Sequence, residues 1–188
     1  MDLKKLLLPF AAALLLFSAT PQTATAQWSI GASYEIRNED PQNGFGARIE
    51  RDILQKLPIV NLGIRAHFSY FSEDNYVGRN NVTYGEITNY DYGLAAVGGV
   101  TVGPISPYVG LGLGASTLDI QGSDAQNPGA DDSSVYWNGF IGSEVSLLPF
   151  IKPFVEYRLQ DVSNYKDEIS NISKQSDGRL IFGVSLQF

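Results

Sequence analysis

The chain contains no cysteine, and its 188 residues include one histidine, one methionine and two tryptophans. Without cysteine there is no disulfide framework, nor the lipid-bearing residue that a bacterial lipoprotein carries after its signal. Long apolar runs are scarce as well. The run from Leu6 to Phe17 has about a dozen residues, fewer than the roughly 20 that a membrane-spanning helix needs. These absences argue against a helical membrane protein.

Positive charge is also in short supply. The chain has 13 Lys and Arg against 20 Asp and Glu, a formal net charge of −7, so nucleic acid is not expected as a partner. Glycine and aromatic residues are frequent instead, with 19 Gly, 10 Tyr and 10 Phe. This composition suits alternating β-strands, and the length suits one domain.

The first residues have the pattern of an export signal. Lys4 and Lys5 precede the apolar run, and Ala24-Thr25-Ala26 supplies the small-x-small pattern at which a signal peptidase cleaves. We predict a signal peptide over residues 1–26, cleaved after Ala26, followed by a single domain over residues 27–188.

The rest of the chain alternates between apolar and polar residues with a period of two, which is typical of strands. The alternation is clearest at 60–70, where Val60, Leu62 and Ile64 share one face and Asn61 and Arg65 share the other. Together with the last residues, the segments that show it number eight. They span residues 28–37, 44–52, 60–70, 86–102, 108–118, 135–147, 154–161 and 179–188.

The connections between these segments alternate in character. Those at 37–43, 72–84, 119–134 and 161–177 are polar and mostly long, whereas those at 52–58, 103–107 and 148–153 are tighter. Each tight connection contains proline, which marks strand boundaries because it cannot donate to a ladder. Strands of 10 or 11 residues, tilted by about 45°, span the roughly 25 Å apolar band of a membrane barrel. An even strand number with long loops at one end predicts a barrel with both termini in the periplasm.

The polar faces of the strands carry charges of both signs. Alternation alone leaves a soluble barrel open, because it has the same period in the opposite phase. We favour the membrane interpretation, in which these residues fill the interior of a closed eight-stranded barrel and must be paired. The predicted lumenal network, which plugs the barrel, consists of Glu35, Arg37, Arg48, Glu50, Arg65, Asp91, Glu144, Glu156, Arg158 and Arg179.

Aromatic residues favour the same orientation. They lie on the apolar phase, several of them near strand ends, where membrane barrels place interfacial girdles. This set contains Trp28, Tyr34, Phe68, Tyr70, Tyr90, Tyr92, Trp137, Tyr157 and Phe188.

Three other motifs are not assigned a chemical role. The glycines of Gly110-Leu111-Gly112-Leu113-Gly114 lack the βαβ context of a nucleotide loop, and we expect them to leave room for bulky lumenal neighbours. The acidic loop with Asp119, Asp124, Asp131 and Asp132 lacks the ligand spacing of a calcium loop. His67 and Ser69 resemble the His-x-Ser pair of outer-membrane lipid A deacylases, but they occupy the phase assigned to the lumen, so a structural role is favoured. No catalytic, cofactor or metal residue is predicted.

The last strand places Leu180, Phe182, Val184, Leu186 and Phe188 on one face and ends on the terminal aromatic. It resembles the closing strand of bacterial outer-membrane barrels, whose assembly machinery favours a terminal Phe. Residues 28–188 resemble the small eight-stranded barrels of the OmpA-like, OmpX-like and opacity-type group, also called porin family. The resemblance implies a monomer in the bacterial outer membrane. It also implies contact with membrane lipid and lipopolysaccharide, and with the barrel-assembly machinery during biogenesis.

Function is less constrained than fold. The leading hypothesis is a non-enzymatic surface protein whose loops serve envelope integrity, adhesion or surface interaction with an unidentified extracellular ligand. Two alternatives stay open, namely narrow, porin-like passage of small solutes and lipid A ester hydrolysis by His67 and Ser69. The loop residues expected to make contacts are Tyr76, Arg79, Tyr84, Tyr165, Lys166 and Lys174.

Overall fold

The computed structural model describes residues 28–54, 60–74, 77, 83, 85–122, 129–148, 150–162 and 176–188. Within these residues, no helix has the length and apolar character to cross a membrane. The described residues form eight strands: β1 (Trp28–Arg37), β2 (Asn43–Leu54), β3 (Val60–Asp74), β4 (Glu86–Val100), β5 (Ile105–Ile120), β6 (Ala130–Val145), β7 (Ile151–Val162) and β8 (Ser176–Gln187). The predicted signal peptide lies outside the described residues.

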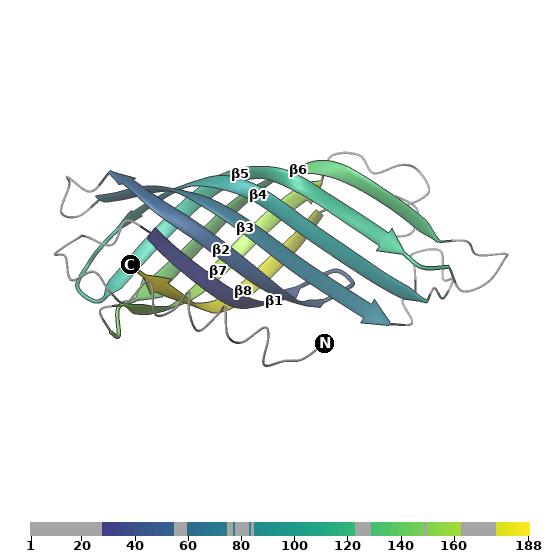
Figure 1. Cartoon of the computed structure of the whole chain (residues 1–188), viewed down its shortest axis with the longest axis horizontal. Coiled ribbons are helices and arrows are strands. Elements are labelled where there is room, and N and C mark those ends of the chain that lie inside the picture. The colour runs from purple at the N-terminus through teal and green to yellow at the C-terminus, as the bar shows by residue number, and fades with distance from the viewer. Residues whose placement is uncertain are drawn as a thin grey trace, which may run out of the picture.

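The strands form one closed antiparallel barrel in sequence order, and β8 pairs with β1 to complete it (Figure 1). Backbone hydrogen bonds between Trp28 and Phe188 seal this junction at one end. The predicted all-β, eight-stranded antiparallel barrel is confirmed. Closure leaves no unpaired sheet edge along the paired parts of the strands.

The register around the barrel fixes its tilt. A path that starts at Ile30 and follows the ladder partners through β2 to β7 reaches β8 at Ser176, ten residues before Leu186, the direct β8 partner of Ile30. With a rise of about 3.4 Å per residue and strands about 4.8 Å apart, this stagger tilts the strands by roughly 40°. Figure 1 shows the strands running obliquely to the long axis of the barrel.

The polar side chains of the strands face the inside of the barrel and the apolar side chains face the outside, as in a membrane barrel. Arg65, Asp91 and Glu156 are at most 1% exposed inside the barrel, whereas Leu111 and Leu113 are each 70% exposed outside it. A soluble barrel would have the opposite arrangement, with its apolar face inside. The predicted aromatics Trp28, Tyr34, Phe68, Tyr90, Tyr92, Trp137, Tyr157 and Phe188 are also exposed on the outside.

Strands β3, β5 and β6 are longer than predicted, with 15 or 16 residues each. At the loop end of β5 the polarity of the two faces reverses, because the inward Leu118 and Ile120 are apolar and buried while the outward Asp119 is exposed. The reversal made this stretch look like a loop in the sequence. The predicted loop at 119–134 was therefore too long, since β5 continues to Ile120 and β6 begins at Ala130. By contrast, β4 ends at Val100, two residues earlier than predicted.

Two prolines expected at strand boundaries lie inside strands. Pro107 is in β5 and has a register partner in β6 but none in β4, and Pro153 is in β7 with a partner in β8 but none in β6. Proline has no backbone N–H to donate to a neighbouring strand. It is tolerated at these two positions because each lacks a neighbouring strand on one side, where no hydrogen bond is lost.

The inward glycines of β5 make room for lumenal side chains, as predicted. A Cβ on Gly112 would lie 2.6 Å from Asn138 Oδ1, and one on Gly114 would lie 2.5 Å from the Tyr136 hydroxyl. Both neighbours come from β6, the next strand. These glycines thus give the large lumenal side chains their space.

Candidate functional site

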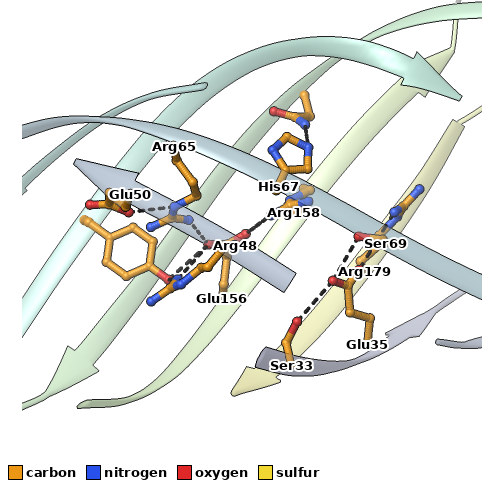
Figure 2. A network of polar contacts seen from close by, with 12 residues as sticks. Ser33, Glu35, Arg48, Glu50, Arg65, His67, Ser69, Glu156, Arg158 and Arg179 are labelled. Carbon is orange, nitrogen blue, oxygen red and sulfur yellow. Dashed lines mark hydrogen bonds and ion pairs between the residues drawn. The ribbon is translucent and has the colours of Figure 1, made fainter. Parts of the chain in front are cut away.

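The interior of the barrel contains two groups of charged side chains. The first, which we call the Glu156 cluster, comprises Arg48, Glu50, Arg65, Glu144, Glu156 and Arg158. Figure 2 shows this cluster apart from Glu144. At its centre, Glu156 Oε2 accepts a hydrogen bond from Arg65 Nη1 at 2.6 Å, and Glu156 Oε1 accepts one from Arg158 Nη2 at 2.7 Å. Arg48 Nη1 lies 3.9 Å from Glu156 Oε2. One fully buried carboxylate therefore holds three guanidinium groups.

The two other carboxylates of the Glu156 cluster complete the charge balance. Arg65 Nε donates to Glu50 Oε2 at 2.7 Å, and Arg48 Nη2 donates to Glu144 Oε1. The side chains of Glu50 and Glu144 retain 17% and 13% exposure, so they occupy the wetter edge of the cluster. Three arginines thus meet three carboxylates, as a buried group of ions requires.

Aromatic rings surround these arginines. Arg48 Cζ lies 3.4 Å from the centre of the Phe154 ring, and Arg65 Cζ lies 4.8 Å from the Tyr108 ring and 4.9 Å from the Phe140 ring. Tyr108 also donates a hydrogen bond to Glu156 Oε2 at 3.0 Å. Guanidinium groups are well suited to such sites, because they stack on ring faces while their edges bind carboxylates.

The second group, the Arg179 cluster, comprises Glu35, Arg37, Asp91, Asp177 and Arg179. Arg179 Nη2 lies 2.5 Å from Asp91 Oδ2, Arg179 Nε donates to Asp177 Oδ1 at 2.7 Å, and Arg179 Nη1 lies 3.9 Å from Glu35 Oε2. Arg37 Nη1 lies 3.6 Å from Asp177 Oδ2 and 2.6 Å from Asn89 Oδ1. This cluster lies toward the loop end of the barrel.

Three inward arginines occupy one row of the ladder, because Arg179 is the register partner of both Arg37 and Arg158. Like charges directly opposite each other destabilise a sheet. Arg158 turns to Glu156, whereas Arg37 and Arg179 share Asp177, and Arg179 also lies at Asp91. The carboxylates that accompany the row offset its repulsion.

His67 and Ser69 lie in the lumen, where they bind different partners (Figure 2). His67 Nε2 is 2.8 Å from the Tyr136 hydroxyl, whereas Ser69 Oγ donates to Glu35 Oε1 at 3.0 Å. His67 is 6% exposed and Ser69 is fully buried, so an acyl ester in the surrounding lipid cannot reach either of them. This geometry is that of a packed polar core and not of a hydrolase site.

The structure brings all ten predicted lumenal residues to the interior and into one of the two clusters. Two residues of the interior were not predicted, namely Asp177, which was assigned to a loop, and Tyr108, whose hydroxyl binds Glu156. The alternation carried a clue to each, since Asp177 shares a face with Arg179 and Tyr108 shares one with Ser106. The predicted contact residues Tyr76, Arg79, Tyr84, Tyr165, Lys166 and Lys174 lie outside the described residues.

At the end of the barrel opposite the long loops there is a polar cavity of about 160 Å³. Asp52, Thr101 and Lys152 line it, together with Arg65 and Tyr108, which belong to or contact the Glu156 cluster. In the part of the chain that the structure describes, no three His, Asp or Glu side chains are grouped as a metal site.

Comparisons with known proteins agree with this architecture. Residues 10–188 match the family model described as outer membrane protein beta-barrel domain. Neisserial surface protein A, from Neisseria, is similar in structure with a TM-score of 0.59 at 16% identity, over 86% of this chain and 96% of that one. A major outer membrane protein from Thermus thermophilus has a TM-score of 0.61 at 12% identity, over 88% and 100%.

A third similar structure is that of Ail, the attachment invasion locus protein of Yersinia pestis, in complex with the heparin analogue sucrose octasulfate. Its TM-score is 0.54 at 14% identity, over 86% of this chain and 96% of that one. No curated protein sequence matches the chain. At these identities, the similar structures support the fold.

Proposed function

The chain belongs to the outer membrane protein beta-barrel domain family, and from its charge-filled lumen we propose that it is a non-enzymatic membrane anchor for surface loops. The observation that carries this proposal is the Glu156 cluster, in which Arg48, Arg65 and Arg158 converge on one carboxylate across the barrel. Such a network obstructs the route of a solute and fixes the barrel walls. The loops then carry the interaction with the surroundings.

We further propose that the long loops lie outside the cell and that both termini face the periplasm. The lengths of β5 and β6 support this orientation, since 16 tilted residues rise about 40 Å and exceed a band of roughly 25 Å. The excess lies at the loop end, where Asp119 and Asp131 are exposed. Long extracellular loops and short periplasmic turns are usual in this class of barrel.

The proposed role of the loops is adhesion, surface interaction or envelope integrity. Ail, with a similar barrel, was crystallised with a polyanion, but the described loop-end residues Asp119, Asp131 and Asp161 of this chain are acidic. Contact with a polyanion would therefore depend on Arg79, Lys166 and Lys174. The expected partners in the membrane are lipid and lipopolysaccharide, the assembly machinery acts at Phe188, and the barrel works as a monomer.

Conductance and solute uptake test the sealed lumen. We expect the purified chain in planar bilayers to give no stable, large conductance, and liposomes that contain it not to swell in small sugars. Swelling that depends on sugar size would favour the alternative function, narrow passage of small solutes. Exchange of Glu156 for Gln should raise any residual conductance, because it releases Arg158.

A further inference from the structure

Two glycines on the outer face of the barrel have no steric reason to be glycine. A Cβ on Gly98 of β4 would meet nothing within 4 Å, and one on Gly139 of β6 would meet only Leu111 and Trp137 at 3.4 and 4.0 Å. The inward glycines differ, since lumenal side chains crowd them. A glycine inside a strand weakens it, and it often marks a site where a ligand approaches the backbone closely.

Both glycines lie in hollows of the apolar face. The larger hollow, of about 970 Å³, includes Tyr92, Leu113 and Trp137 in its lining, and a smaller one, of about 430 Å³, contains Gly98 and Gly139. The two share Ala96 and Leu111 and so form one groove across β4, β5 and β6, adjacent strands in Figure 1. We call it the β4–β6 groove.

The loop end of this groove is polar and acidic. Ala115, in the groove lining, is followed on the outer face of β5 by Thr117, whose hydroxyl is 2.8 Å from that of Ser133. The next outward pair is Asp119 and Asp131, which are direct ladder partners and both exposed. Among the described residues, neither carboxylate has an ion pair with Lys or Arg. Like charges directly opposite each other destabilise a sheet, and a bound cation would offset this.

We propose that the β4–β6 groove binds the acyl chain of a membrane lipid whose headgroup carries an amine, with the ammonium group between Asp119 and Asp131. Four residues of tilted strand separate Ala115 from Asp119, roughly 10 Å along the membrane normal, which suits a headgroup above an acyl chain. A symmetric second copy would bring the same carboxylates together, whereas an ammonium complements them. The proposal rests on the membrane position of the barrel and not on its sealed lumen.

Native mass spectrometry of the full chain in detergent, with dioleoyl phosphatidylethanolamine, phosphatidylcholine or phosphatidylglycerol added, tests the headgroup. We expect phosphatidylethanolamine to bind about tenfold more tightly than phosphatidylglycerol, the factor for one charge-assisted hydrogen bond. Asp119→Asn combined with Asp131→Asn should abolish this preference and leave binding of the acyl chain. Equal binding of the two lipids by the native chain would overturn the proposal.

A second pair of variants tests the groove. Ala96→Leu with Gly98→Leu fills it and should reduce binding of all three lipids, whereas Ala32→Leu with Ala47→Leu, at outward ladder partners on β1 and β2, should not. Heat-modifiable migration verifies that each variant folds. Equal losses of lipid binding in the two double variants would contradict a lipid site. So would a dimer of the native chain that is lost only in the groove-filling variant. If that variant does not fold, the aspartate variant alone decides.

Discussion

Removal of one charge from the centre of the lumen is the most direct test of the network. Glu156→Gln preserves the size of the side chain and its hydrogen-bonding oxygen but removes the negative charge that three arginines share. Among the described residues, Arg158 has no other ion-pair partner, and its Nη1 already lacks a hydrogen bond. The substitution therefore leaves a buried guanidinium without a counter-charge.

The expected cost follows from that burial. Loss of one partner from a buried ion pair destabilises a protein by about 3–5 kcal/mol, because the remaining charge stays desolvated. The same chemical change at Glu50 is the matched control. Glu50 is partly exposed, and Arg65 keeps Glu156 when Glu50 is neutralised. Glu50→Gln should therefore cost only about 1 kcal/mol.

Urea titration of the folded chain in lipid vesicles measures both costs. Trp28 and Trp137 lie on the outer surface, so their fluorescence reports transfer from lipid to water. Adding Arg158→Met to Glu156→Gln removes the unpaired cation and places an apolar side chain beside Phe140. This double variant should recover part of the stability. Equal costs for Glu156→Gln and Glu50→Gln, or no recovery in the double variant, would refute the network argument.

Three further predictions concern other parts of the barrel. Leu113→Arg, in the apolar band, should lower the free energy of unfolding in vesicles by about 2–4 kcal/mol, whereas Asp119→Arg, on the same face of β5, should not lower it. Gly112→Val should cost about 1–3 kcal/mol, because its Cβ would lie 2.6 Å from a lumenal amide oxygen. Gly98→Val, with nothing within 4 Å, should not lower the free energy of unfolding in the same titration. Finally, cells that express His67→Ala should give the same lipid A mass spectrum as cells that express the native chain. A deacylated lipid A that appears only with the native chain would contradict this prediction.

The sequence predicted the architecture because the strand period and the membrane impose the same pattern. Alternation such as Val60, Leu62 and Ile64 against Asn61 and Arg65 requires a strand with one apolar face. Charges of both signs on the polar face then favoured the interior of a closed barrel, where they can be paired. Strand number and inside-outside phase could therefore be derived from residues alone.

The partners within the lumen could not be predicted, because alternation gives the face of a residue but not its height. Arg48 of β2 meets Glu144 of β6 across the barrel, and that meeting depends on the stagger of the strands. The stagger is a sum over eight registers, each of which the sequence leaves open. The ring contacts of Arg48 with Phe154 have the same origin.

The strand ends were missed for a different reason, which also indicates where the membrane ends. Up to Ala115, β5 has its apolar side chains outside, whereas beyond it Thr117 and Asp119 face outward and Leu118 and Ile120 are buried. In hydrocarbon the outer face must be apolar, and in water the inner face must be, so the reversal marks the boundary between the two solvents.

The contents of the barrel change at the same level. Asp91, in the Arg179 cluster, is the ladder partner of Ser116, next to the reversal, and the buried apolar group of Ile87, Leu118 and Ile120 lies on the loop side of it. Ion pairs, with the Tyr108 and Phe140 rings packed among their arginines, therefore fill the part of the barrel within hydrocarbon, and an apolar group lies inside the part in water. The interior of one chain is thus packed differently on the two sides of the boundary.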